Sequence, residues 1–205
     1  MTRLVQLRSS LRHIAQLAWS EDRAAQIVEF AVSLPLLVLF VVGIFDFSGA
    51  FTLKQKLTNV ARDAARAAAA DPANDLQAPS LSVPSSVADA FQVVDHYFVA
   101  NKLNDCGILP TGSPSNLTWT FTASGNGCPP PGLKIIINRG YYFPSSGVAQ
   151  PSLTCVPASP GAVIGTCVSI QYAYSWRFGR AASLLGASTA LPQYITATAV
   201  ALNEN

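Results

Sequence analysis

The sequence predicts an α+β protein: a long N-terminal helix that crosses a membrane, then a small antiparallel-sheet head with one or two packed helices. Two observations lead to this prediction. No charged residue lies between Phe30 and Phe45, and a helical apolar stripe continues beyond that run to Ala70. In the second half of the chain, apolar and polar residues alternate in short segments separated by Gly- and Pro-rich stretches, a pattern typical of half-buried strands.

The first 24 residues, 1–24, are predicted to be a cytoplasmic leader. Leu4, Leu7 and Leu11 recur at helical spacing, while Arg3 and Arg8 lie off that stripe. Two interpretations fit this pattern: a basic amphipathic helix on a membrane surface, or a poorly ordered precursor segment that is cleaved.

The next segment, Ile27 to Phe47, is predicted to be the transmembrane span. Its length of about 20 residues is just enough to cross a bilayer, although a buried helix of a soluble protein is an alternative. Basic residues flank both ends, so the positive-inside rule does not decide the orientation. The cysteine-bearing C-terminal part is the better guide, and we place it outside.

Glu29 stands at the start of this span. An ionised carboxylate is costly in hydrocarbon, so the simplest interpretation places it at the interface, near the positive end of the helix dipole. If the precursor were cut after Ala24, Ala25 would become the N-terminus, and its α-amine would be largely protonated. Glu29 of one subunit could then pair with the amine of a neighbour. Pro35 lacks a backbone N–H, so the helix is expected to kink or loosen there.

Beyond the span, an apolar stripe through Leu53, Leu57, Ala64 and Ala68 continues the helix until Asp71-Pro72 stops it. We therefore divide the chain into a transmembrane and extended helix over 25–70, a linker over 71–86 and an α+β head over 87–205. The apolar stripe is too narrow to be buried alone, so it should pack on the head or on other subunits.

The head is predicted to begin with a helix capped by Ser85 or Ser86. Four strand-like segments follow, the second interrupted at residues 138–140: Leu117–Ala123, Leu133–Phe143, Val168–Phe178 and Tyr194–Leu202. An antiparallel sheet covered by one or two helices is the most economical arrangement.

All four cysteines, Cys106, Cys128, Cys155 and Cys167, lie in this head. An even number beyond a membrane segment indicates an oxidising compartment and two disulfides. Of the three possible connectivities, we favour Cys106–Cys128 and Cys155–Cys167 because the partners are neighbours in sequence. Zinc ligation requires closer ligand pairs than these.

Several segments, taken in order, resemble the TadE-like family, the membrane-anchored minor pilins (pseudopilins) of the bacterial tight-adherence, or Flp, pilus. They cover about residues 23–70 and are Arg23-Ala24-Ala25-Gln26, Val28-Glu29-Phe30-Ala31, Leu34-Pro35-Leu36-Leu37, Gly43-Ile44-Phe45-Asp46-Phe47-Ser48 and Ala61-Arg62-Asp63-Ala64-Ala65-Arg66-Ala67.

The resemblance implies a pilin-like fold and cleavage between Ala24 and Ala25 by a prepilin peptidase; family members usually have glycine where this chain has Ala24. It also implies an assembly role for Glu29, Phe30 and Pro35. The implied partners are other pilin subunits and the assembly platform of the inner membrane. The implied location is a single-pass protein of that membrane, with its head in the periplasm or outside and possible incorporation into the pilus.

No catalytic or cofactor-binding pattern accompanies these features. The chain has 13 Lys and Arg, 11 Asp and Glu and a formal net charge of +2, which lacks the basic footprint of a nucleic-acid-binding protein. His13 and His96 are isolated, and phosphate-binding loops, nucleophile elbows and carboxylate pairs are absent from the sequence. We therefore expect no enzyme activity, cofactor or metal.

Two rival interpretations remain. One is an exported soluble binding or adhesin-like domain released from a long signal peptide, with Ser48-Gly49-Ala50 as a small-x-small cleavage site. The other is a membrane-tethered enzyme, for which the sequence shows no catalytic set.

Overall fold

The computed structural model describes residues 2–76, 83–143, 155, 163–184 and 191–204. Side chains are described from Ala25 onward, apart from those of Ala73, Val163, Ala182 and Leu184. The chain divides into two compact units. We call Met1–Asp46 with Arg177–Thr189 the stem unit, and Phe47–Trp176 with Ala190–Asn205 the head unit.

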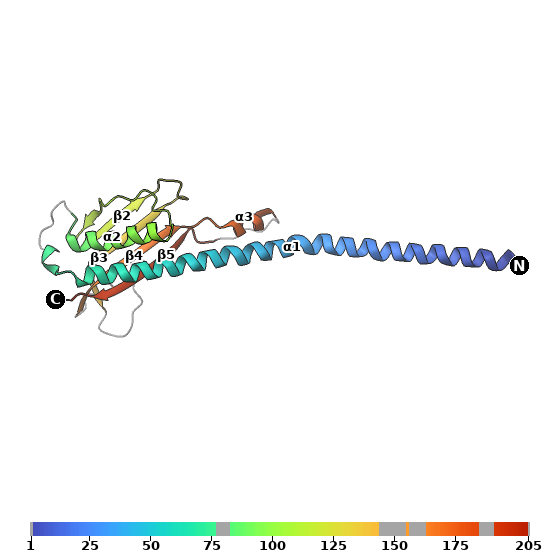
Figure 1. The fold of residues 1–205 in the computed structure, drawn as a ribbon, viewed down its shortest axis with the longest axis horizontal. Coiled ribbons are helices and arrows are strands. Elements are labelled where there is room, and N and C mark those ends of the chain that lie inside the picture. The colour runs from blue at the N-terminus through green and yellow to red at the C-terminus, as the bar shows by residue number, and fades with distance from the viewer. Residues whose placement is uncertain (1, 77–82, 144–154, 156–162, 185–190, 205) are drawn as a thin grey trace. The chain divides into compact units, whose positions relative to one another are not determined.

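Helix α1, Thr2–Ala70, supplies most of the stem unit and the first element of the head unit (Figure 1). It confirms the predicted long apolar helix and extends it backward, since residues 2–24 are helical and continuous with the apolar segment. Pro35 lies inside α1, and the helix continues on both sides of it. The helix ends where Pro72 removes a backbone donor and fixes the chain outside the helical path.

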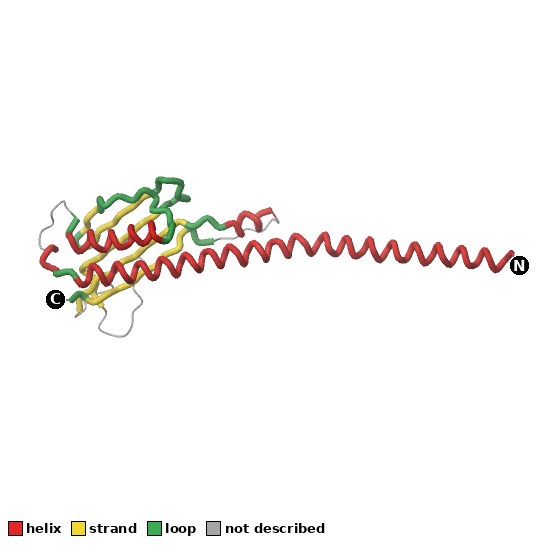
Figure 2. The backbone as a smooth tube through the Cα atoms, viewed as in Figure 1, coloured by secondary structure: helices red, strands yellow, loops and turns green. Residues whose placement is uncertain are grey.

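The head unit contains one five-stranded antiparallel sheet, as predicted for an α+β fold (Figure 2). The spatial order of the strands equals their order in the chain, so each strand pairs with the next one. The strands are β1 (Ser113–Ser115), β2 (Thr118–Ala123), β3 (Leu133–Phe143), β4 (Val163–Ala173) and β5 (Tyr194–Leu202).

The part of α1 after Phe47 and helix α2, Ser85–Ala100, pack on one face of this sheet (Figure 1). Alternate residues of the central strands face these helices, including Ile135 and Ile137 of β3 and Val168 and Ile170 of β4. Their intervening neighbours face the opposite side, where Ile136 belongs to a second, smaller buried cluster. The period-two pattern of the sequence therefore places one apolar face against the helices.

The start of α2 corrects one prediction. Neither Ser85 nor Ser86 caps the helix with its side chain, since the residue before the first turn is Pro84, which makes no side-chain cap. The carboxylate of Asp75 performs that function from the short 3₁₀ helix η1, Ala73–Leu76. Its Oδ2 accepts hydrogen bonds from the backbone N–H of Ser86 at 2.9 Å and from the Ser85 hydroxyl at 3.2 Å. A charged acceptor at a helix N-terminus satisfies free amides and complements the dipole.

The predicted strand Val168–Phe178 is wrong at both ends. Strand β4 begins at Val163 and ends at Ala173, and Arg177–Leu184 forms helix α3. By contrast, β3 has the predicted bounds and β5 matches its predicted range. The expected interruption of β3 is a shift of pairing register between Asn138 and Tyr141, which turns Tyr141 toward the second cluster.

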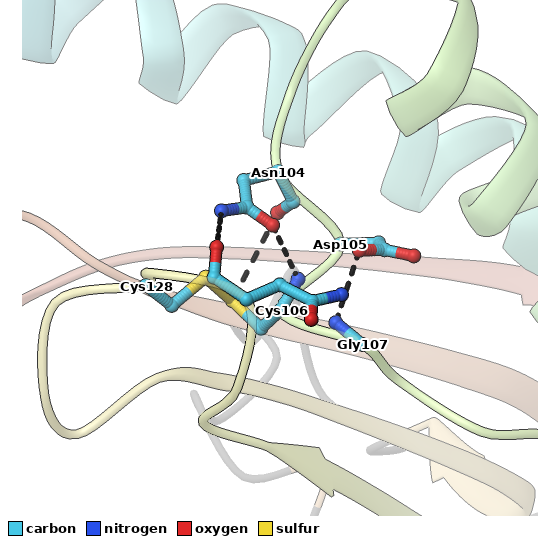
Figure 3. Close-up of a disulfide and its surroundings, with 6 residues drawn as sticks. Asn104, Asp105, Cys106, Gly107 and Cys128 are labelled. Carbon is cyan, nitrogen blue, oxygen red and sulfur yellow. Dashed lines mark hydrogen bonds between the residues drawn. A yellow bond between two sulfur atoms is a disulfide. The ribbon is translucent and has the colours of Figure 1, made fainter.

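Two disulfides join the cysteine pairs that are neighbours in sequence. Cys106 is bonded to Cys128 with Cα atoms 5.3 Å apart, and Cys155 to Cys167 with Cα atoms 5.6 Å apart. Figure 3 shows the first bridge, where Asn104 and Asp105 accept hydrogen bonds from the backbone N–H groups of Cys106 and Gly107. The bridge thus closes a loop whose turn is already fixed by local side-chain acceptors.

Candidate assembly surface

The apolar part of α1 in the stem unit exposes large side chains around most of the helix. Ile27 is 69 % exposed and Phe45 is 75 % exposed. Between them, the following apolar residues are also exposed: Val28, Phe30, Val32, Leu34, Leu36, Leu37, Val38, Phe40, Val41 and Ile44. A helix that is apolar all round is stable only in an apolar surrounding, so this segment requires lipid, other helices or both. It is the one helix among the described residues that is long and apolar enough to span a membrane.

Glu29 and Asp46 mark the two ends of this segment. They lie 17 positions apart, about 26 Å at 1.5 Å per residue, close to the ~30 Å hydrocarbon thickness of a bilayer. The side chain of Glu29 is exposed. Phe30 and Pro35, the other two residues that are predicted to act in assembly, are also exposed. A neighbouring helix can therefore reach all three.

The predicted processing site lies at the N-terminal edge of this segment. Ala24 belongs to helix α1, but its side chain lies outside the described residues. Ala25, the predicted new N-terminus, is exposed. The transmembrane range Ile27 to Phe47 and the division of the chain at residues 24, 70 and 86 stay predictions.

One stripe of the stem segment is covered. Leu39 and Val42 are half-buried, and Gly43 and Asp46 are buried, at the i, i+3, i+4 and i+7 positions of one helix face. Part of the cover is Phe178 of α3. Its backbone N–H donates to Asp46 Oδ2 at 2.9 Å, and its ring would lie 3.1 Å from a Cβ placed on Gly43. The glycine is therefore what allows α3 to pack closely here.

In the head unit, the same helix has a fully buried face. Leu57, Val60, Ala61, Ala64 and Ala68 are each 0 % exposed and belong to the main core. The three alanines among these positions let the helix backbone approach the sheet closely. The sequence predicted that this apolar stripe of α1 packs on the head or on other subunits. The structure shows that the protein's own head covers it.

Arg139 is the most unexpected residue of the head, because it is 0 % exposed at the centre of β3. It follows Ile135 and Ile137 on the helix-covered face. Its Nη1 donates to the carbonyl of Ala68 and, at 2.8 Å, to Thr166 Oγ1. Nη2 donates to the carbonyl of Asp71 at 3.0 Å.

These contacts hold the C-terminal end of α1 against the sheet. The last carbonyls of a helix lack intrahelical partners and carry partial negative charge. Arg139 binds two carbonyls around that end, and the backbone N–H of Glu204 binds a third, that of Ala69, at 2.9 Å. Sequence reasoning treated Asn138-Arg139-Gly140 only as a strand interruption. The available signal was an arginine that follows a run of three isoleucines and precedes two tyrosines in the same strand.

Carboxylates surround the same helix end. Burial lowers the pKa of Arg139, and Asp75 and Asp71 oppose that effect by stabilising its charge. The pKa of Asp71 is raised by burial first, and then by a hydrogen bond and repulsion from Asp89, while Arg139 lowers it. Asp71 Oδ2 has no hydrogen-bond donor among the described residues, so no donor at that oxygen offsets the burial of its charge.

The head unit contains a groove lined mainly by hydroxyl-bearing and apolar side chains. It has a volume of about 480 Å³ and lies between the start of the head-unit part of α1 and the end of β4. Its lining contains one cation, Lys56, with hydroxyl groups and apolar side chains, but no carboxylate or histidine. His96 lies elsewhere and is exposed. Among the described residues, no three His, Cys, Asp or Glu side chains are grouped to hold a metal ion.

The comparison with protein families gives one match. Residues 24–66 match the model described as "TadE-like protein", which confirms the resemblance that the sequence motifs indicate. The matched range contains Glu29, Pro35 and the exposed apolar segment, and it indicates a protein associated with the Tad pilus. No curated protein and no solved structure matches the chain.

Proposed function

We propose that this chain, whose residues 24–66 match the TadE-like family, is a minor pilin (pseudopilin) that takes part in assembling a bacterial tight-adherence pilus. The observation that carries the proposal is the apolar segment of α1, which is exposed on nearly every side and lies wholly inside the family match. A segment of this kind needs partners along its length. Its large apolar side chains are exposed, so the partners we propose are lipid before assembly and other pilin helices afterwards.

The proposal includes a location and a set of partners. The single apolar helix anchors the chain in the inner membrane, and the two disulfides favour a head in an oxidising compartment, the periplasm or the exterior. A prepilin peptidase would act between Ala24 and Ala25. Other pilin subunits and the inner-membrane assembly platform would then engage the mature helix.

The role we propose is structural rather than catalytic. It requires no cofactor or metal, and it assigns no reaction to the head. The chemistry that we propose is instead electrostatic: Glu29 would pair with the α-amine of Ala25 in a neighbouring subunit, so that neither charge is left alone within an apolar bundle.

N-terminal sequencing of the mature protein tests this proposal directly. A start at Ala25 supports a processed pilin. A start at Phe51 would instead indicate a soluble domain released after Ser48-Gly49-Ala50, and it would overturn the proposal. Such a cut would remove the whole exposed apolar segment and Ala50 but leave the core positions of α1 from Leu53 onward in the head.

Substitution of Glu29 tests the pairing. Glu29→Ala should leave membrane insertion intact and reduce surface piliation at least about tenfold, because a buried amine then lacks its partner. Glu29→Asp, which keeps the charge, should retain part of the function. Ser33→Ala is the matched control, since Ser33 is exposed one turn along the same face and bonds only to the Phe30 carbonyl of its own helix at 3.3 Å. Normal piliation in Glu29→Ala cells would show that the pairing is not used.

A further inference from the structure

We propose that α3 is a membrane-interface helix, and that Arg177 and Arg180 bind the phosphate groups of anionic phospholipids in the leaflet at the Asp46 end of the membrane segment. This inference rests on the proposed membrane anchoring of α1. It concerns only the stem unit, in which α3 and the apolar segment belong together.

The position of α3 along α1 is the first argument. Its first turn is fixed to Asp46 by the Phe178 N–H, and the Phe178 ring packs at Gly43. Asp46 is the first charged residue after Glu29, and it follows the exposed apolar residues Ile44 and Phe45. The point where hydrocarbon gives way to water must therefore lie near Asp46. The contacts with Asp46 and Gly43 hold α3 at that level.

The distribution of charge on α3 is the second argument. Arg177, Arg180 and Ser183 are exposed, and their i, i+3, i+6 spacing places them on one side of the helix. Phe178, which lies on the opposite side, is half-buried, and so is Ala181 at the edge between the two sides. The sequence of α3, RFGRAASL, contains two arginines and no acidic residue. A short helix with a cationic exposed side and an apolar side is typical of segments that lie in the membrane interface.

The guanidinium groups of Arg177 and Arg180 suit the phosphate groups of lipids. An arginine fork matches a phosphate group through two parallel N–H donors, and its charge is attracted to a negative lipid surface. Because Phe178 anchors α3 to the transmembrane helix, little conformational freedom remains to be lost on binding. The expected consequence is that lipid headgroups hold α3, and with it the Asp46 end of the apolar segment, at a defined depth in the membrane.

Hydrogen exchange of the full-length protein tests the proposal. The protein would be placed in nanodiscs of phosphatidylcholine alone, or with about one third phosphatidylglycerol, and exchange of the peptide covering α3 would be compared with that of α2. Each basic residue near an anionic surface favours binding by a factor of about five. The amides of α3 should therefore exchange about five- to 30-fold more slowly in the anionic discs, and about 0.5 M salt should reduce the difference.

The variants make the experiment specific. R177Q/R180Q should remove the lipid dependence. R62Q/R66Q is the matched control, because Arg62 and Arg66 are also exposed arginines on one helix face but lie on α1 in the head unit; it should behave as the wild type.

Identical exchange of α3 in both lipids would overturn the inference while leaving the pilin proposal intact. A wild-type chain that alkaline carbonate extracts from membranes would overturn the anchoring itself, and the inference with it. Protection of α3 that requires a second subunit rather than anionic lipid would also overturn it.

Discussion

Replacement of Arg139 by methionine tests whether this buried residue fixes the end of α1 to the sheet. Methionine has a long, flexible side chain and fills most of the space, so the change removes the charge and the donors while creating little cavity. Four acceptors lose a donor: the carbonyls of Ala68 and Asp71, Thr166 Oγ1 and Asn203 Oδ1.

The expected magnitude follows from what those acceptors can do afterwards. Thr166 and Asn203 retain each other, because the Thr166 hydroxyl donates to Asn203 Oδ1 at 2.6 Å. The two backbone carbonyls have no such substitute, and each unsatisfied buried acceptor costs about 1–3 kcal/mol. The guanidinium in turn no longer has to be desolvated, which offsets part of this loss. We expect the free energy of unfolding to fall by about 2–4 kcal/mol.

Thermal unfolding of the full chain in detergent measures this loss. For a chain of this size, 1 kcal/mol corresponds to about 2–4 °C, so Arg139→Met should lower the melting temperature by roughly 4–16 °C. Arg62→Met is the control, since Arg62 is exposed on α1 and should change the melting temperature by less than about 2 °C. An unchanged or higher melting temperature in Arg139→Met would refute the reasoning, because it would mean that burying the charge costs as much as its hydrogen bonds contribute.

Three further predictions concern the same head. Asp75→Ala removes the acceptor at the start of α2 and should cost about 0.5–2 kcal/mol, measured by the same melting experiment with exposed Asp63→Ala as the control. Asp71→Asn should flatten the pH dependence of stability: the folded-state pKa of Asp71 is raised above 3.8, so the folded chain holds its proton more tightly and wild-type stability declines as pH rises from 3.8 through the raised pKa; a variant that keeps the wild-type slope would contradict this assignment. Replacing Cys155 and Cys167 together by alanine should cost about 3 kcal/mol, because the bridge closes a loop with a sequence separation of 12, and an unchanged urea midpoint would argue against that contribution.

The parts of the fold that were predictable are those where one local pattern acts alone. Strand β5 matches its predicted range because Ile195, Ala197 and Ala199 alternate with half-buried polar residues, and no other element competes for that segment. The long helix was equally evident from the uncharged run and the stripe that follows it. The disulfide pairs agree with sequence proximity, since the two bridges close short loops with sequence separations of 22 and 12.

The mispredicted parts are those where distant residues decide. The apolar alternation continues past Ala173 to Phe178, and a strand would continue with it. The backbone N–H of Phe178 instead donates to Asp46, far away in sequence, and helix α3 forms from Arg177. In the same way Ser86 carries the signature of an N-cap, but the carboxylate of Asp75 takes the position. Both are tertiary contacts that override a local preference, and each involves an aspartate that single-sequence patterns cannot assign to its partner.

The exposure profile of α1 gives the strongest link between fold and function. From Ala50 to Ala68 one face of the helix is buried by the protein's own sheet, and the end of the helix is held by Arg139. Among the described residues of the stem unit, α1 before Asp46 is covered only along the stripe that includes Gly43. The helix is therefore anchored firmly at one end and left free to accept other partners at the other. A membrane anchor alone would need only the apolar composition. A carboxylate at Glu29, placed where a neighbouring helix can reach it, is the additional feature that favours assembly with other subunits over anchoring alone.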